Sequence, residues 1–231
     1  MASARSLLEL GVADAVIAGA TDTLCGLTAN GFTALQVIAE GITNPCSRNR
    51  QGITLGEGTA IFVVTRESGG VQLRGVGESS EAHHMSAPDP RGAGAEAAMR
   101  AALEDAGLMP DAIVHLSLHG TGTRLNDAME CSAISRAFPS PPPCSSPKPL
   151  VGHTLGAAGA LEAGFCWLQL EEGQPDGLTV VPHIYDGEWD PELAPIPLAG
   201  KGMQVPVGPV MSNSFGFGGN NCSLLLERGA P

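Results

Sequence analysis

Three glycine-flanked polar stretches in the second half of the chain constrain its fold more than any other feature. They occupy residues 119–123, 148–159 and 212–221. In each stretch, an apolar run or a turn delivers polar groups to a place where glycine lets the backbone bend and lets another molecule come close. Two histidines, one lysine and a glycine–phenylalanine loop are therefore the candidate chemistry of this chain.

The composition predicts a globular protein that does not bind nucleic acid. The chain has 231 residues, of which 43% are hydrophobic, enough to bury a sizeable core as one large domain or as one domain plus part of another. Its formal net charge is −12 with only 12 Lys and Arg residues, whereas binding a phosphate backbone needs clustered basic residues.

The cysteines and the apolar runs predict a soluble, cytoplasmic chain. The six cysteines lie far apart without a Cys-x-x-Cys pair, which is unlike a zinc ribbon or a disulfide scaffold and favours reduced, mostly buried thiols. Glu9 and Asp14 interrupt what would have to be the apolar core of a signal peptide. No apolar run approaches the length of a membrane span.

The first 70 residues predict a helix, a buried strand, a second helix and a second strand. These elements are expected at residues 2–10, 15–20, 29–41 and 60–64, with a polar loop at 44–52 and a boundary at 66–70. A buried strand that follows barely two helical turns has no earlier strand to pair with. We therefore expect that the start of a larger domain precedes it.

Strands and helices alternate in the rest of the chain, which indicates the α/β class. Apolar residues recur at helical spacing from Ala95 to Ala106, and Gly107 ends this helix. The other helices are expected at 126–138 and, almost wholly buried, at 156–170. The strands are expected at 71–76, 113–118, 210–212 and 222–226, and the Pro/Ser stretch 139–147 is expected to be an exposed loop.

The three stretches resemble the three motifs of β-ketoacyl-acyl-carrier-protein synthases of the elongating, two-histidine type. The motifs are His119-Gly-Thr-Gly-Thr, Lys148 followed by Gly152-His-Thr-Leu-Gly-Ala-Ala-Gly, and Ser212-Asn-Ser-Phe-Gly-Phe-Gly-Gly. Gly56-Glu-Gly and His84-Met-Ser-Ala-Pro are similar to further family motifs. The resemblance covers essentially the whole chain, and its motifs are specific.

The resemblance implies a thiolase-like fold with layers αβαβα. Residues 1–69 would be the tail of the N-terminal half, and residues 70–231 the complete C-terminal half. In the family, a nucleophilic cysteine lies upstream of the strand that matches residues 15–20. We therefore expect the nucleophile-bearing portion to be absent from this chain, and the chain alone not to form an acyl-enzyme.

The implied reaction is decarboxylative Claisen condensation in fatty-acid, polyketide or polyene biosynthesis. A malonyl thioester loses CO2, and the resemblance assigns His119 and His153 as the N–H donors that stabilise the enolate oxygen. Lys148 would be buried with Glu130 as its acidic partner. No metal or cofactor is implied, because the phosphopantetheine of an acyl carrier protein carries the substrates.

The resemblance also assigns residues that contact the substrate. Phe217, with Phe215 and Gly218, would supply the oxyanion donor and the gate of the acyl pocket, and Thr121, Thr123 and Ser86 would contact pantetheine. Docking of an acidic carrier would need a basic patch, for which Arg48, Arg50, Arg91 and Arg124 are candidates by residue type. The implied assembly is a homodimer, or a heterodimer with a complete synthase.

Each assignment has a structural alternative. His119 and His153 could be core histidines, and Phe215 and Phe217 could be core residues. Asp127-Ala-Met-Glu130 equally fits a helix-capping box. His83 and His84 beside Glu81 suggest a metal site, but adjacent side chains point in different directions, so a plain loop is favoured.

Three functions stay open at this point. One is a synthase that is inactive in this truncated form. The second is a non-condensing partner that resembles a chain-length factor. The third is a residual malonyl-carrier-protein decarboxylase that uses the histidines alone.

Overall fold

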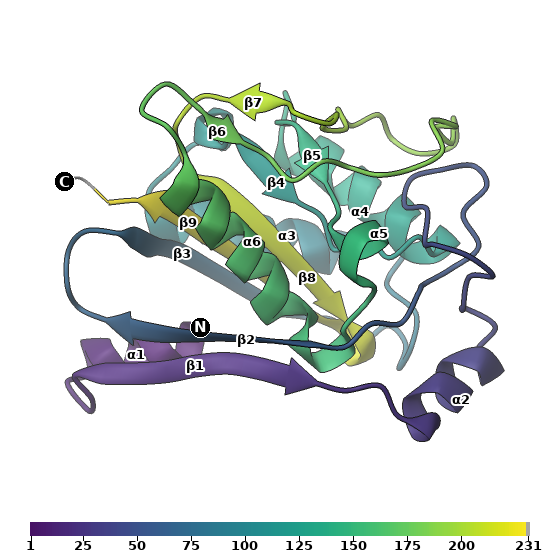
Figure 1. Cartoon of the computed structure of the whole chain (residues 1–231), viewed down its shortest axis with the longest axis horizontal. Helices are drawn as coiled ribbons and strands as arrows, with labels where there is room; N and C mark the ends of the chain where they lie inside the picture. Colours follow the sequence, from purple (N-terminus) through teal and green to yellow (C-terminus); the bar gives the residue numbers. More distant parts are fainter. Residues whose placement is uncertain (230–231) are drawn as a thin grey trace.

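The structure, a computed structural model, describes residues 1–229 and is built around a five-stranded mixed sheet (Figure 1). Its strand order is β3-β9-β8-β4-β5, with bounds Val71–Ser80, Asn220–Arg228, Val210–Gly216, His115–Ser117 and Cys144–Ser145. The β3–β9 and β9–β8 pairs are antiparallel, and the β8–β4 and β4–β5 pairs are parallel. This mixture of strands and helices confirms the predicted α/β class.

Helices α3 (Ala93–Ala106) and α4 (Arg124–Ala137) cover one face of the sheet. The predicted apolar stripe of α3 is buried, and Gly107 ends the helix in the left-handed region with φ 66°. Gly77 of β3 allows the close approach of this helix, because a Cβ there would lie 1.9 Å from the carbonyl oxygen of Ala98.

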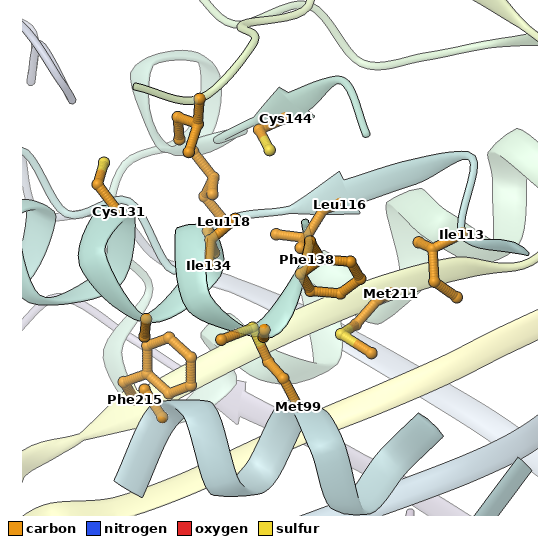
Figure 2. Close-up of a cluster of buried hydrophobic side chains, with 14 of the residues drawn as sticks. Met99, Ile113, Leu116, Leu118, Cys131, Ile134, Phe138, Cys144, Met211 and Phe215 are labelled. Carbon is orange, nitrogen blue, oxygen red and sulfur yellow. The ribbon is translucent and has the colours of Figure 1, made fainter. Parts of the chain in front are cut away.

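A cluster of apolar side chains fills the space between this face and the two helices (Figure 2). Met99 comes from α3, Ile134 from α4, Leu116 from β4 and Met211 from β8, and all four are buried. The cluster anchors β4, which leads into the first polar stretch, and β8, which carries the first residues of the third.

Helix α6 (Ala158–Glu172) covers the other face of the sheet and also packs against the two-stranded sheet of β1 (Ala15–Asp22) and β2 (Gly58–Thr65) (Figure 1). The prediction that this helix is buried nearly all round is wrong, because Trp167 and Leu168 reach the surface. The described chain thus forms four layers: α3 with α4, the large sheet, α6, and the β1–β2 sheet.

The prediction that residues 15–20 form a fully buried strand is also wrong. β1 and β2 pair antiparallel, and alternate residues of both strands face α6 or the surface. On the outer face Ile17, Ile61 and Val63 are 77%, 63% and 70% exposed. The apolar sequence of these strands therefore reflects two apolar faces, of which α6 covers only one.

Other expected elements are shifted. The helix predicted at 29–41 is α2 (Gly26–Ala34), and it ends before Gln36, whose φ is 56°. The stretch 139–147 is not an exposed loop throughout, because it supplies β5, which is buried as an edge strand beside β4. The remaining elements are α1 (Ala2–Glu9), η1 (Pro110–Ala112), α5 (Lys148–Val151), η2 (Leu155–Ala157), β6 (Leu178–Thr179), β7 (Gln204–Val205) and η3 (Phe217–Gly219).

The state of the cysteines and the character of the helices bear on the class predicted for the chain. All six cysteines are free thiols, and four of them are buried. No helix within residues 1–229 has the length and apolar character needed to cross a membrane.

Candidate active site

The three polar stretches converge on one cavity of about 870 Å³. His119 and Thr121 line it from the end of β4, His153 from the turn before η2, and Phe215 and Phe217 from the end of β8 and η3. Residues 32, 35–37 and 50–53 of the first half close another side. Segments far apart in sequence thus build a single site.

His119 and His153 form the polar centre of this cavity. Their ring centroids are 5.4 Å apart and their planes are 84° apart, an edge-to-face arrangement. The ring of Phe215 lies 6.1 Å from that of His119 and is buried beside it. The alternative that the two histidines are separate core residues is not supported by this geometry, because both rings face the same cavity.

Both imidazoles are neutral at physiological pH. Burial lowers the pKa of His119 well below its usual value, with smaller contributions from the charge of Lys148 and from His153. Burial, followed by the Lys148 charge, lowers the pKa of His153 to about 3. Nδ1 of His153 accepts the backbone N–H of Leu155 at 3.3 Å, so the Nε2 atom of the neutral ring carries the proton. Nδ1 of His119 is buried without a partner.

Glu130 holds the loop that carries His119. Its two carboxylate oxygens accept the backbone N–H groups of His119 and Gly120, each at 2.8 Å. Burial raises the pKa of Glu130 to about 7, although these hydrogen bonds act in the opposite direction. The capping-box interpretation is wrong, because the N-cap of α4 is Thr123, whose side chain accepts the N–H of Asn126.

The direct acidic partner of Lys148 is Glu162, and the assignment of Glu130 to this pairing is wrong. Lys148 is buried, and its Nζ donates to Oε1 of Glu162 and to the carbonyl oxygen of His119. Glu162 was missed in the sequence. It is the only charged residue in the run 156–170, in which Gln169 is the only other polar side chain, and that isolation was the available signal.

A second buried ion cluster supports the same loop. Nη1 of Arg50 donates to Asp190 and to the carbonyl oxygen of Ser47, and its Nε lies 3.6 Å from Asp127. Asp127 also accepts the N–H of Gly122 at 3.1 Å. Arg50 is therefore a buried structural residue, and its assignment to a carrier-docking surface is wrong.

Gly122 has to be glycine because two segments meet at this point. Its φ is 73°, and a Cβ there would lie 2.3 Å from the hydroxyl of Thr43. The single proton of that hydroxyl is shared between the carbonyl oxygens of Gly52 and Thr121, which lie 2.7 Å and 2.9 Å from its oxygen. The contact fixes the wall formed by residues 50–53 against the loop of His119.

The glycine–phenylalanine loop places its two aromatic rings differently. Phe215 is buried, whereas Phe217 is 55% exposed at the cavity edge and lies 5.9 Å from the ring of Phe32. Gly218 does not line the cavity, and its N–H donates to the carbonyl oxygen of Met85 at 2.9 Å. The assignment of Gly218 to the oxyanion and gate group is therefore not met in this conformation.

The residues expected to contact pantetheine all line the cavity. They are Thr121, Thr123 and Ser86, and the first two hydroxyls lie 2.9 Å apart. His84 accepts the N–H of Ser86 and lies in an exposed loop. Residues 1–229 contain no cluster of His, Cys, Asp or Glu that could hold a metal ion. None of the described residues that line the cavity is a cysteine.

Family models match both parts of the chain. The model "Beta-ketoacyl synthase, N-terminal domain" matches residues 1–69, and "Beta-ketoacyl synthase, C-terminal domain" matches residues 71–177.

Curated relatives match nearly all of the chain. The 3-oxoacyl-[acyl-carrier-protein] synthase 2 of Staphylococcus aureus (strain COL) is 32% identical over 97% of this chain and 57% of its own length. That of Coxiella burnetii is 33% identical over 94% of this chain and 55% of its own length. The chain thus spans a little over half the length of the relatives it matches.

Solved structures share the fold. A complex of the ketosynthase ApeO with its chain length factor ApeC from Xenorhabdus doucetiae matches with a TM-score of 0.92 and 46% identity, over 98% of this chain and 56% of the other. A beta-ketoacyl synthase from Burkholderia phymatum STM815 matches with a TM-score of 0.90 and 31% identity, over 99% and 58%. These similarities confirm the thiolase-like layered fold implied by the motifs.

Proposed function

Because the chain belongs to the β-ketoacyl-acyl-carrier-protein synthase family, we propose that its cavity carries out the decarboxylation step of a Claisen condensation on carrier-bound substrates. One observation carries the proposal: two neutral imidazoles face each other edge-to-face at 5.4 Å in an otherwise largely apolar cavity. Such a pair suits an oxygen on which negative charge develops.

The geometry suggests the following chemistry. The bond between the malonyl carboxylate carbon and the adjacent carbon breaks, CO2 leaves, and the bonding electrons move onto the thioester carbonyl as an enolate. The Nε2–H of His153 donates to that oxygen. The His119 ring supplies the second donor, and the substrate sets its tautomer, because no protein group binds its Nδ1.

Condensation needs a second component. The enolate carbon attacks an acyl thioester, which the family holds on a cysteine, and none of the described cavity residues is a cysteine. We propose that the nucleophile comes from outside these residues, through a nucleophile-bearing segment or subunit. The similarity to ketosynthases solved with chain length factors supports a role within a two-subunit assembly.

The test is CO2 release from malonyl-loaded acyl carrier protein. The 231-residue chain is expected to release CO2 without extending an acyl chain. His119→Ala and His153→Ala should each lower the rate by about 100-fold or more, the typical effect of removing one oxyanion donor. His83→Ala, in the exposed loop, is the matched control and should keep the wild-type rate.

Two outcomes would contradict the proposal. Retained decarboxylation in both histidine variants would remove their assigned role. A folded chain that releases no CO2, but that allows a full-length synthase subunit, inactive without it, to extend an acyl chain, would favour the non-condensing, chain-length-factor-like function.

A further inference from the structure

Arg124 is an exposed cation that lines the mouth of the cavity and is not engaged in any ion pair with residues 1–229. We infer that it forms a phosphate subsite, which holds the phosphate of a 4′-phosphopantetheine arm while the thioester end of the arm lies at the histidines. This inference rests on the proposed function and adds a recognition element to it.

The other arginines considered for carrier docking are already occupied. Arg48 pairs with Glu188 at the surface, Arg91 pairs with Asp89, and Arg50 is buried with Asp190. An arginine engaged with a carboxylate must give up that partner before it binds a phosphate, whereas Arg124 has no such partner to lose.

The charges around the cavity direct an anion to Arg124. The only acidic side chain among the described lining residues is Glu81, which accepts the N–H of Asp89. Asp190 attracts Arg124 at longer range, but its two oxygens already accept hydrogen bonds from Arg50 and from the N–H of Glu192. The guanidinium of Arg124 therefore has free donors at the rim.

The two ends of the cavity differ in charge. At the inner end, both histidines are neutral, and the ammonium of Lys148 is bound to Glu162 and to a carbonyl oxygen. A cation beside the malonyl carboxylate would stabilise the substrate more than a transition state that loses this charge as CO2. The free positive charge lies instead at the exposed end, where the permanently charged group of the arm enters.

Polar groups connect the two ends. Arg124 is the first residue of the 14-residue helix α4 and directly follows Thr123. The hydroxyls of Thr121 and Thr123 lie between the rim and His119 along the chain and both line the cavity. An arm with amide groups along its length and a phosphate at one end matches this order of hydroxyl donors and guanidinium.

Binding of two compounds that differ only by the phosphate tests the inference. Isothermal titration of the 231-residue chain would compare 4′-phosphopantetheine with pantetheine. The wild-type chain should bind the phosphorylated compound about tenfold more tightly or better, as one charge-assisted contact allows. Arg124→Ala should reduce this ratio to about one, and Arg124→Lys should retain part of it.

Arg74→Ala is the charge-matched control, because Arg74 lies on β3 and pairs with Glu227. An unchanged ratio in Arg124→Ala, an equal loss in Arg74→Ala, or no binding of 4′-phosphopantetheine to the wild-type chain would each overturn the phosphate subsite.

Decarboxylation of malonyl-pantetheine tests the proposed function separately, because this substrate lacks the phosphate that Arg124 would bind. CO2 release from malonyl-pantetheine that depends on His119 would uphold the proposed function even if the subsite fails.

Carrier protein and coenzyme A present the same phosphate in different surroundings. If Arg124 binds the phosphate itself, Arg124→Ala should raise the KM for malonyl-carrier protein and for malonyl-coenzyme A, and leave that for malonyl-pantetheine little changed. An effect confined to malonyl-carrier protein would mean that Arg124 contacts the carrier surface, and would overturn the assignment to the phosphate.

Discussion

At the residue scale, the buried charges of the site divide into two functions. Glu130 holds the backbone of the His119 loop through two N–H groups, whereas Glu162 neutralises Lys148. Lys148 in turn donates to the carbonyl oxygen of His119. The backbone of His119 is therefore held through both its N–H group and its carbonyl oxygen. The effect of removing each carboxylate on the free energy of unfolding should therefore depend differently on whether Lys148 is present.

A double-mutant cycle separates these two functions. Glu162→Leu leaves the buried ammonium of Lys148 without its carboxylate and should destabilise the fold by about 3–5 kcal/mol. Lys148→Met should recover much of this loss in the double variant, because apolar pairs often replace buried ion pairs at little cost. Urea unfolding of the four proteins gives the coupling energy.

The control for this cycle is Glu130→Gln. It keeps one good acceptor for the N–H groups of His119 and Gly120, and should couple to Lys148→Met by less than Glu162→Leu does. A larger coupling with Glu130 would restore it as the principal acidic partner of Lys148.

At the element scale, the β1–β2 sheet has one face against α6 and one face open (Figure 1). Phe62 packs toward the core, while Ile17, Ile61 and Val63 form an apolar outer face. A contiguous exposed apolar patch on a sheet favours association with other proteins. The exposure also means that these three side chains contribute little to the stability of the described chain.

Ile17→Thr with Ile61→Thr should therefore reduce concentration-dependent association without loss of stability. Threonine is β-branched and suits a strand, so the free energy of unfolding should change by no more than about 0.5 kcal/mol. Phe62→Ala on the inner face is the contrasting control and should cost about 2 kcal/mol or more. Light scattering over a range of protein concentrations and urea unfolding provide the measurements. Association that persists unchanged in the double variant would show that another surface is responsible.

Elements with strong local signals were predicted, whereas the two-residue strands were not. The stripe of α3 and the stop at Gly107 depend on residues within one helix, so the sequence pattern was sufficient. β5 has two residues and is a strand only because β4 lies beside it, a contact that no local pattern records. The burial of β1 was overestimated because an apolar run does not reveal how many of its faces are covered.

At the scale of the whole molecule, the motifs predicted which residues meet but not what holds them. The convergence of His119, His153 and Phe217 on one cavity followed from the resemblance. The supporting ion pairs of Lys148 with Glu162 and of Arg50 with Asp190 join distant segments. A charged residue in a sequence can be recognised as unusual, but its partner depends on the fold.

The buried histidines also make the stability of the whole chain depend on pH. Four of the six histidines have a pKa lowered by burial: His115 (to about 4), His119, His153 (to about 3) and His183. Below pH 6.5 the unfolded chain binds protons that the folded chain excludes. Each group therefore removes about 1.4 kcal/mol of stability per pH unit until its folded pKa is reached.

Three buried carboxyl groups oppose this trend, because burial raises the pKa of Glu130 to about 7 and also raises the pKa of Glu162 and of Asp127, so the folded chain gains stability as they are protonated. The four histidines should outweigh them, and stability should fall between pH 6 and pH 5. Urea unfolding at several pH values measures the slope. His115→Gln should make it shallower, and Glu130→Gln should make it steeper. A stability that rises on acidification would contradict the neutral, buried state of the histidines.

The bonds that hold the cavity wall also determine when the wall can form during synthesis. Cys46, Ser47 and Arg50 are bound by Asp127, Asp186 and Asp190, across sequence separations of 81, 139 and 140 residues. At about 5–20 residues per second, a ribosome supplies Asp190, the last of these partners, roughly 7 to 28 seconds after Arg50. Until then Arg50 lacks its Asp190 partner and the apolar outer side chains of β1 and β2 are exposed, so we expect the nascent chain to bind chaperones that recognise exposed apolar segments.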